Sequence, residues 1–237
     1  MDSYKKEYKI LSSDTDLHQR LRLSRLFTFL QEAAIAHTEQ LGAGREKTLD
    51  RGLLWVVTLQ QAKINRLPVY DETIRLESLP GDIMHTFFPR YYRVSDAAGH
   101  TLVTAAALWA LMDGETRVMV FPEKAQIHID GGRPDWEIFL PRPPKLPDGA
   151  RAQTFVVPYS YVDLNGHMNN TRYFDLAEDM MPAALRDASV REVLTEYTGE
   201  ARLNDAVTLK SSSGDGEFRL SGTAEKRLFR IGIRYEI

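Results

Sequence analysis

The chain has 237 residues, 43% of them hydrophobic, which is enough apolar content to bury the core of one large domain or two small ones. Its 30 Lys and Arg residues against 33 Asp and Glu residues give a formal net charge of −3, which argues against a nucleic-acid-binding or polybasic membrane-anchored protein. It contains no cysteine, which excludes disulfides, thiolate metal ligands and a cysteine nucleophile.

The cellular setting and the need for a cofactor are indicated by what the sequence lacks. The N-terminal MDSYKKEYKI has no apolar signal core, and no run approaches the ~20 apolar residues of a membrane span, so we expect a cytoplasmic protein. The six histidines show neither an HExxH motif nor close-paired ligand spacing. We therefore expect no metal and no other cofactor.

The first half of the chain has the pattern of a strand, a long helix and a meander of strands. After the strand-like YKKEYKIL, apolar residues over 20–41 recur three, four or seven positions apart and predict a helix that ends at Gly42. From Leu53 to Met112, β-rich segments such as LLWVVTLQQAKI and HTLVTAAALWALMD alternate with turn signals. This half is predicted to form an α+β module, residues 1–120.

A proline-rich segment follows and separates two parts of the chain. Residues 121–149 contain too many prolines for a helix or a central strand, so they predict a linker that wraps a surface. The domain boundary falls near residue 148, and a C-terminal module is predicted over 150–237.

The second half repeats the order of elements in shorter form. AQTFVVPYSYVD predicts a strand, Tyr173 to Leu185 carry a second helical stripe interrupted at Pro182, and four strand-like segments follow. Asp14-Thr-Asp-Leu-His18 before the first helix parallels Asp163-Leu-Asn-Gly-His167 before the second. We predict two tandem α+β modules, each with one helix lying on an antiparallel sheet.

The segment DLNGHMNN, residues 163–170, places an acid, an imidazole and three amides immediately before the second helical pattern. An ordinary turn and helix cap would account for Gly166 and for Asn169 or Asn170. It leaves Asp163, Asn165 and His167, which can move protons or orient a carbonyl group. The segment is therefore a candidate active site.

The extended segment DLNGHMNNTRYFDLAED resembles the start of the main helix in hotdog-fold thioesterases. Their signature is an Asp four residues before the His of a Gly-His-x-Asn-Asn run, with an aromatic residue three positions beyond the run. The matching residues are Asp163, Gly166, His167, Asn169, Asn170 and Tyr173. The tandem arrangement narrows the resemblance to acyl-ACP thioesterases, the plant-type enzymes that release fatty acids and their bacterial relatives. TEYTGEARLND is similar to the family strand in which Glu-Tyr precedes a catalytic Glu-Cys pair.

The resemblance implies two tandem hotdog modules, each a long helix wrapped by an antiparallel β-sheet. The N-terminal module would hold the acyl chain and carry a degenerate site, because Gln-Arg-Leu-Arg follows His18 where Met-Asn-Asn-Thr follows His167. The family's catalytic positions fall on Asp163, Asn165, His167 and Glu200 of the C-terminal module. Ala201 stands where many members have cysteine, so a water activated by a carboxylate, with Glu200 as the first candidate base, must attack the thioester.

Further roles follow from the same resemblance. The N–H groups at the helix start beyond Asn169 are expected to polarise the thioester carbonyl, and His167 and Asn165 to orient water or the carbonyl. Asp163 is expected to hold the geometry of His167 or Asn165, or to share the role of base with Glu200. Asn169 and Asn170, together with Trp55, are the expected substrate-binding residues.

The implied reaction is hydrolysis of a fatty acyl thioester on acyl carrier protein (ACP), giving free fatty acid and holo-ACP. The absence of a transit peptide favours a bacterial enzyme, as monomer or homodimer. The basic residues Arg133, Arg142, Lys145 and Arg151 lie near the module boundary but are interleaved with acids, so they predict no clean docking patch. An acyl-CoA thioesterase of the same fold and a non-catalytic acyl-binding or dehydratase-like hotdog protein remain alternatives.

Overall fold

The computed structural model describes residues 3–136 and 140–236. The first half contains β1 (Tyr4–Lys9), α1 (Leu23–Gln40), β2 (Leu53–Ile64), β3 (Thr73–Pro80), β4 (Phe87–Ser95), β5 (Thr101–Asp113), β6 (Met119–Val120) and α2 (Pro122–Ala125). The second half contains β7 (Arg151–Val156), α3 (Arg172–Met180), α4 (Ala183–Asp187), β8 (Val190–Tyr197), β9 (Ala206–Gly214), β10 (Glu217–Thr223) and β11 (Arg227–Tyr235).

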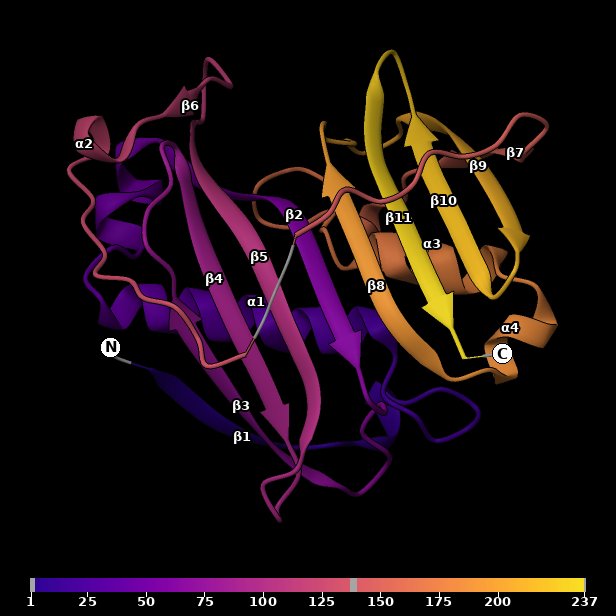
Figure 1. Cartoon of the computed structure of the whole chain (residues 1–237). Helices are drawn as coiled ribbons and strands as arrows, with labels where there is room; N and C mark the ends of the chain where they lie inside the picture. The colour runs from indigo at the N-terminus through magenta and orange to yellow at the C-terminus, as the bar shows by residue number, and fades with distance from the viewer. Residues whose placement is uncertain (1–2, 137–139, 237) are drawn as a thin grey trace.

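The strands of both halves join into one antiparallel sheet (Figure 1). Among the described residues it has 11 strands in the order β1-β3-β4-β5-β2-β8-β11-β10-β9-β7, with β6 paired to β5 alone. The halves meet where β2 pairs with β8, for example Gln60 with Thr195. This pairing satisfies strand edges that would otherwise be exposed. The two-module α+β prediction is confirmed.

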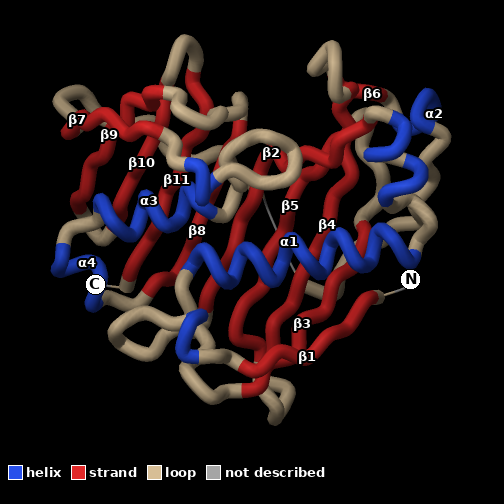
Figure 2. The backbone as a smooth tube through the Cα atoms, turned by 180° about the vertical axis from the view of Figure 1, so that it is seen from behind, coloured by secondary structure: helices blue, strands red, loops and turns tan. Residues whose placement is uncertain are grey.

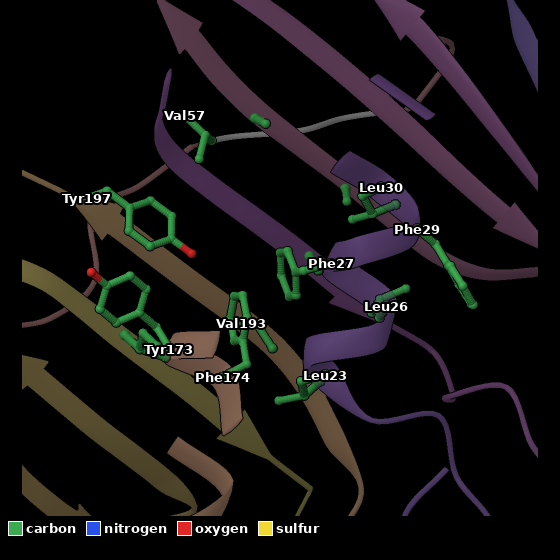
Figure 3. Packing of buried hydrophobic residues seen from close by; sticks show 14 of the residues in the cluster. Leu23, Leu26, Phe27, Phe29, Leu30, Val57, Tyr173, Phe174, Val193 and Tyr197 are labelled. Carbon is green, nitrogen blue, oxygen red and sulfur yellow. The ribbon is translucent and has the colours of Figure 1, made fainter. Parts of the chain in front are cut away.

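The two main helices cross the same face of the sheet (Figure 2). Their apolar residues meet between the modules, where the rings of Phe27 on α1 and Phe174 on α3 stack at 4.1 Å between centroids, both almost fully buried (Figure 3). Full burial of a side chain of this size stabilises the fold by about 1.5–3 kcal/mol. The modules therefore share one core across α1 and α3.

The helices differ from the predicted ranges at their ends. Leu21 forms a β-bridge with Thr15 and Arg20 forms one with Val69, so α1 begins only at Leu23. Its C-terminus is as predicted, because Gly42 adopts the left-handed φ of 69° that favours glycine. In the second half Pro182 separates α3, of only 9 residues, from α4, so the second main helix is not long.

The linker runs over the sheet face opposite the helices (Figure 1). Gly132 bridges Gly81, and Arg142 forms a 3.2 Å ion pair with Glu196 of β8. The expectation that prolines exclude helix here is wrong at its start, because Pro122 is the first residue of α2, where its missing N–H is not needed. Residues 137–139 of the predicted linker lie outside the described residues.

Candidate active site

The loop from Val162 to Thr171 is folded by its own main chain. Val162 bridges Met168, and Asp163 N–H donates to His167 O at 2.9 Å. Gly166, with φ 77°, donates its N–H to Asp163 O at 3.0 Å, in a conformation that disfavours residues with a side chain. The turn leaves His167 almost buried, its side chain 10% exposed.

The Asp163 carboxylate organises this loop. Its Oδ1 accepts from Asn165 N–H at 2.9 Å, and its Oδ2 accepts from Asn169 Nδ2 at 3.2 Å. Asn169 Oδ1 in turn accepts from both the N–H and the hydroxyl of Thr171, the residue before α3. Asp163 therefore positions two amides, and in the described structure none of its hydrogen bonds reaches the imidazole of His167.

Glu200 reaches the loop from the segment after β8. Met168 N–H donates to Ala201 O at 2.7 Å, and His167 bridges Arg202, so the two segments lie in register. This places Glu200 Oε2 3.1 Å from His167 Nε2. His167 and Glu200, which are 33 positions apart in the sequence, were both predicted as site residues, and the structure brings them into contact.

Arg117, which sequence analysis did not select, completes the cluster from the other module. Its Nη1 donates to Glu200 Oε1 at 3.2 Å, and its Nη2 lies 3.2 Å from His167 Nε2. Arg117 has φ 58° in the turn between β5 and β6, where its N–H donates to Asp113 O at 3.0 Å. The DGETR turn could have been recognised as a turn, but nothing local connects it to residue 167.

The burial of His167 favours its neutral form. Burial lowers the pKa of His167 below its ordinary value, and the Arg117 and Arg202 cations act in the same direction. The carboxylates of Glu200 and Asp163 oppose this shift but do not reverse it. The Nε2 atom of neutral His167 donates to Glu200 Oε2 in the tautomer that carries its proton there and accepts from Arg117 in the other tautomer.

Two cavities meet at the loop. The inner cavity, of about 230 Å³, lies between α1 and strands of the first module. The outer cavity, of about 570 Å³, is lined by Arg117, His167 and Glu200. The residues that line both are Leu54, Trp55, Asp163, Asn165 and Asn170. A group lying at this junction would be surrounded by predicted site residues.

The predicted substrate-binding residues differ in their surroundings. Trp55 packs edge-on against Phe88 at 4.8 Å and lies at the junction, as Asn170 does. Asn169 instead turns inward to Asp163 and Thr171. The expected free amides at the helix start are partly used, since Thr171 N–H donates to the Asn169 side chain and Arg172 N–H to Asn169 O.

The first module carries a different set of groups at the equivalent place. Thr15 bridges Leu21 as Val162 bridges Met168, so Asp16 corresponds to Asp163 and Arg20 to His167. The parallel drawn between His18 and His167 is therefore out of register by two residues. Leu21 N–H donates to Pro68 O as Met168 N–H donates to Ala201 O, which places Leu67 at the position of Glu200.

The described residues form neither a metal-binding cluster nor a membrane-spanning helix. Within 3–136 and 140–236, no three His, Asp or Glu side chains gather in a way that could hold a metal ion. None of the helices in those ranges combines the length and hydropathy needed to cross a bilayer.

The fold and site define a tandem hotdog protein with a carboxylate–histidine cluster at the junction of its modules. The family model for the acyl-ACP thioesterase N-terminal domain matches residues 1–124, and that for the C-terminal domain matches residues 145–233. The chain belongs to the acyl-ACP thioesterase family.

Known proteins resemble the chain over nearly its whole length. A chloroplastic acyl-[acyl-carrier-protein] hydrolase of Cuphea viscosissima is 24% identical over 91% of this chain, which spans 57% of that relative's length. The structure of a 12:0-ACP thioesterase from Umbellularia californica superposes with a TM-score of 0.85 at 19% identity, covering 99% of this chain and 97% of that one. An acyl-ACP thioesterase from Bacteroides thetaiotaomicron gives 0.80 at 20% identity, covering 99% and 98%.

Proposed function

We propose that the chain hydrolyses the thioester of fatty acyl-ACP to free fatty acid and holo-ACP, without a covalent acyl-enzyme. The observation that carries this proposal is the contact of Glu200 with both His167 and Arg117 beside the junction of two cavities. The names of the relatives, acyl-ACP hydrolases and thioesterases, support the same reaction.

The proposed substrate lies across the junction. The acyl chain enters the 230 Å³ cavity, and the pantetheine arm leaves through the 570 Å³ cavity. The thioester carbonyl then lies beside Asn165 and Asn170, whose side-chain amides can donate hydrogen bonds to the oxyanion that forms on attack. Donors positioned in this way act on the transition state more than on the ground state.

Glu200 is the proposed general base. It removes a proton from a water whose oxygen attacks the carbonyl carbon, and the carbon–sulfur bond then breaks as the tetrahedral intermediate collapses. The same proton returns to the departing thiolate, so atoms and charge balance. Arg117 donates to one oxygen of the Glu200 carboxylate, and His167, in the neutral form that carries its proton on Nε2, donates to the other, so the two residues fix the orientation of the base.

ACP is the proposed carrier, as in the printed names of the relatives. Arg117, Arg202 and Lys226 line the outer cavity beside the acids Asp163, Glu200, Asp205 and Glu225, so these cations are proposed to bind the phosphate of the carrier's prosthetic group rather than an acidic protein surface. The second candidate is an acyl-CoA thioesterase, because the phosphates of CoA would meet the same cations. A non-catalytic acyl-binding protein is disfavoured by the Glu200–His167 contact, which binding alone would not need.

The decisive experiment compares one acyl chain on ACP and on CoA, with free thiol release as the readout. Faster turnover of acyl-ACP, abolished by Glu200→Gln, supports the proposal. Faster turnover of acyl-CoA would assign the second candidate, and binding without turnover on either carrier would reject both enzymes. Charge reversal of Lys226 should raise KM for acyl-ACP more than it lowers kcat, because this residue contacts only the carrier side of the cavity system.

We further propose that the protein acts in the bacterial cytoplasm as a monomer or homodimer and needs no metal. The absence of cysteine and the nearly balanced charge are compatible with this setting. Sedimentation at several concentrations would measure the oligomeric state, and activity after chelator treatment would test the metal-free reaction.

A further inference from the structure

The inner cavity is lined by a buried cation as well as by apolar side chains. Much of its lining is apolar, including Ile35, Phe88 and Trp109, as expected for a pocket that receives a hydrocarbon chain. Arg90 of β4 and Thr38 of α1 also line it. Arg90 is only 5% exposed, so a guanidinium lies in the interior of the first module, where a methyl terminus would be expected to fit better.

The contacts of Arg90 leave part of its hydrogen-bonding capacity unused. Nη1 donates to Ser78 Oγ at 3.1 Å and lies 2.9 Å from His37 Nδ1, and Nη2 donates to Thr38 Oγ1 at 3.0 Å. These contacts account for three of the five N–H groups of the guanidinium. His37 accepts at Nδ1 only in a neutral form. The side chains that hold Arg90 therefore supply no negative charge.

No carboxylate of the described residues forms an ion pair with Arg90. Glu39 and Asp163 line the same cavity, but Glu39 accepts from Arg45 N–H at 2.7 Å and Asp163 holds Asn165 and Asn169. Burial lowers the pKa of the Arg90 guanidinium, which reflects the cost of holding this charge away from water. A buried cation is normally paired, because desolvation is otherwise uncompensated.

We propose that the inner cavity receives an acyl chain carrying an oxygen function near its far end, a hydroxyl, keto or carboxylate group, which accepts hydrogen bonds from Arg90. This inference rests on the proposed function, since it assumes that the chain enters from the junction at Asn165 and Asn170. The chain interior lies along Phe88 and Trp109, and the terminal oxygen uses the remaining guanidinium protons. Arg90 is then a specificity-determining residue that selects both the chain length and its polar end.

The test uses three series of acyl-ACPs, from butyryl to tetradecanoyl, ending in methyl, hydroxyl or carboxylate. Where the tip reaches Arg90, an oxygenated chain should exceed its methyl-ended counterpart in kcat/KM by roughly 10- to 100-fold, the range for hydrogen bonds to a charged group. At shorter lengths the three series should not differ. A larger advantage for carboxylate than for hydroxyl would show that the charge contributes.

Two variants separate recognition from folding. Arg90→Met should remove the advantage of oxygenated tips, while Arg90→Lys, which keeps the charge, should retain part of it. The matched control is Arg93→Met on the same strand, because Arg93 pairs with Glu77 at 2.9 Å and does not line the cavity. Turnover of butyryl-ACP, too short to reach the wall, reports whether each variant is folded and active.

Binding of non-hydrolysable amide analogues of the same chains distinguishes this inference from the proposed function. If no thioester is cleaved but oxygenated analogues still bind more tightly at one length, the reaction is wrong and the inference stands. If thioesters are cleaved and methyl-ended chains are preferred at every length, or if Arg90→Met leaves the ratio unchanged, the inference is overturned. Absence of binding by any analogue would also overturn it.

Discussion

Arg20 holds in the first module the place that His167 holds in the second. In each module the next residue donates its main-chain N–H to the segment that follows a strand. Leu21 donates to Pro68 O, after β2, at 2.8 Å, and Met168 donates to Ala201 O, after β8, at 2.7 Å. Arg20 donates to the main-chain oxygens of Arg186 and Ala188, so its guanidinium binds the main chain in and after α4. The duplicated fold therefore keeps the turn but carries different chemistry at its two copies.

The single-site arrangement predicts unequal effects of matched substitutions. His167→Ala and Glu200→Gln should each lower kcat for acyl-ACP by about 10²–10⁴, because each removes a positioned proton-transfer or hydrogen-bonding group. His18→Ala should change kcat little, since His18 contacts Asp187 at the surface. Steady-state kinetics with circular dichroism as a folding control provide the measurement. Comparable losses at positions 18 and 167 would mean that both modules work.

Arg117 should shift the acidic limb of the pH dependence of kcat/KM through its effect on the pKa of His167. The Arg117 cation helps to lower the pKa of His167, so Arg117→Met should raise that pKa and move the acidic limb of kcat/KM to higher pH. Arg117→Lys, which keeps a positive charge, should move it less. Profiles of the three proteins on one substrate give the comparison. A uniform loss of rate with an unmoved limb would restrict Arg117 to a structural role.

Ala201 should tolerate a thiol without gaining activity from it. Its side chain is fully buried, and it does not line the outer cavity as its neighbours Glu200 and Arg202 do. Because the chain has no other cysteine, alkylation of the Ala201→Cys variant reports on this position alone. We expect the folded Ala201→Cys variant to react slowly with thiol alkylating agents and to turn over no faster than wild type. A large gain in turnover, with an acyl-enzyme trapped by rapid quench, would contradict the water mechanism.

Glu178 links the two main helices. From α3 its Oε1 accepts from the N–H of Leu23, the first residue of α1, at 3.0 Å, and its Oε2 accepts from Arg22 at 3.1 Å. Glu178→Ala should lower the free energy of unfolding by about 0.5–2 kcal/mol, as for loss of a helix cap. Calorimetry with Glu236→Ala as a surface control tests this. An unchanged unfolding free energy would show that the cap contributes nothing.

The same residue gives a pH-dependent stability difference. Burial raises the pKa of Glu178 above its ordinary 4.5, so the folded protein holds this proton more tightly than the unfolded chain. Its contribution is therefore fully present below the unfolded pKa and is lost as pH rises through the folded pKa. As pH rises above the ordinary pKa of 4.5, Glu178→Gln should therefore gain stability relative to wild type. The opposite trend would show that Arg22 dominates the environment of the carboxylate.

Local patterns in the sequence were sufficient for much of the fold. The segment LLWVVTLQQAKI coincides with β2, Leu53–Ile64, and Pro182 separates α3 from α4 as its geometry requires. Hydrophobic periodicity, proline and glycine act on neighbouring residues, so these elements can be predicted without knowing what packs on them. The start of α1 could not, because bridges from Thr15 and Val69 extend the preceding loop to Arg22.

The sequence by itself determined the composition of the site loop, with Asp163, His167 and the asparagines in one turn, and the exclusion of a cysteine mechanism. Only the tertiary structure decided that Arg117 of the first module joins His167 and Glu200, and that a buried Arg90 faces the inner cavity. The physical reason is distance along the chain. Contacts within a turn follow from neighbouring residues, whereas these contacts depend on β2 pairing with β8 and on how β4 and β5 pack beneath α1.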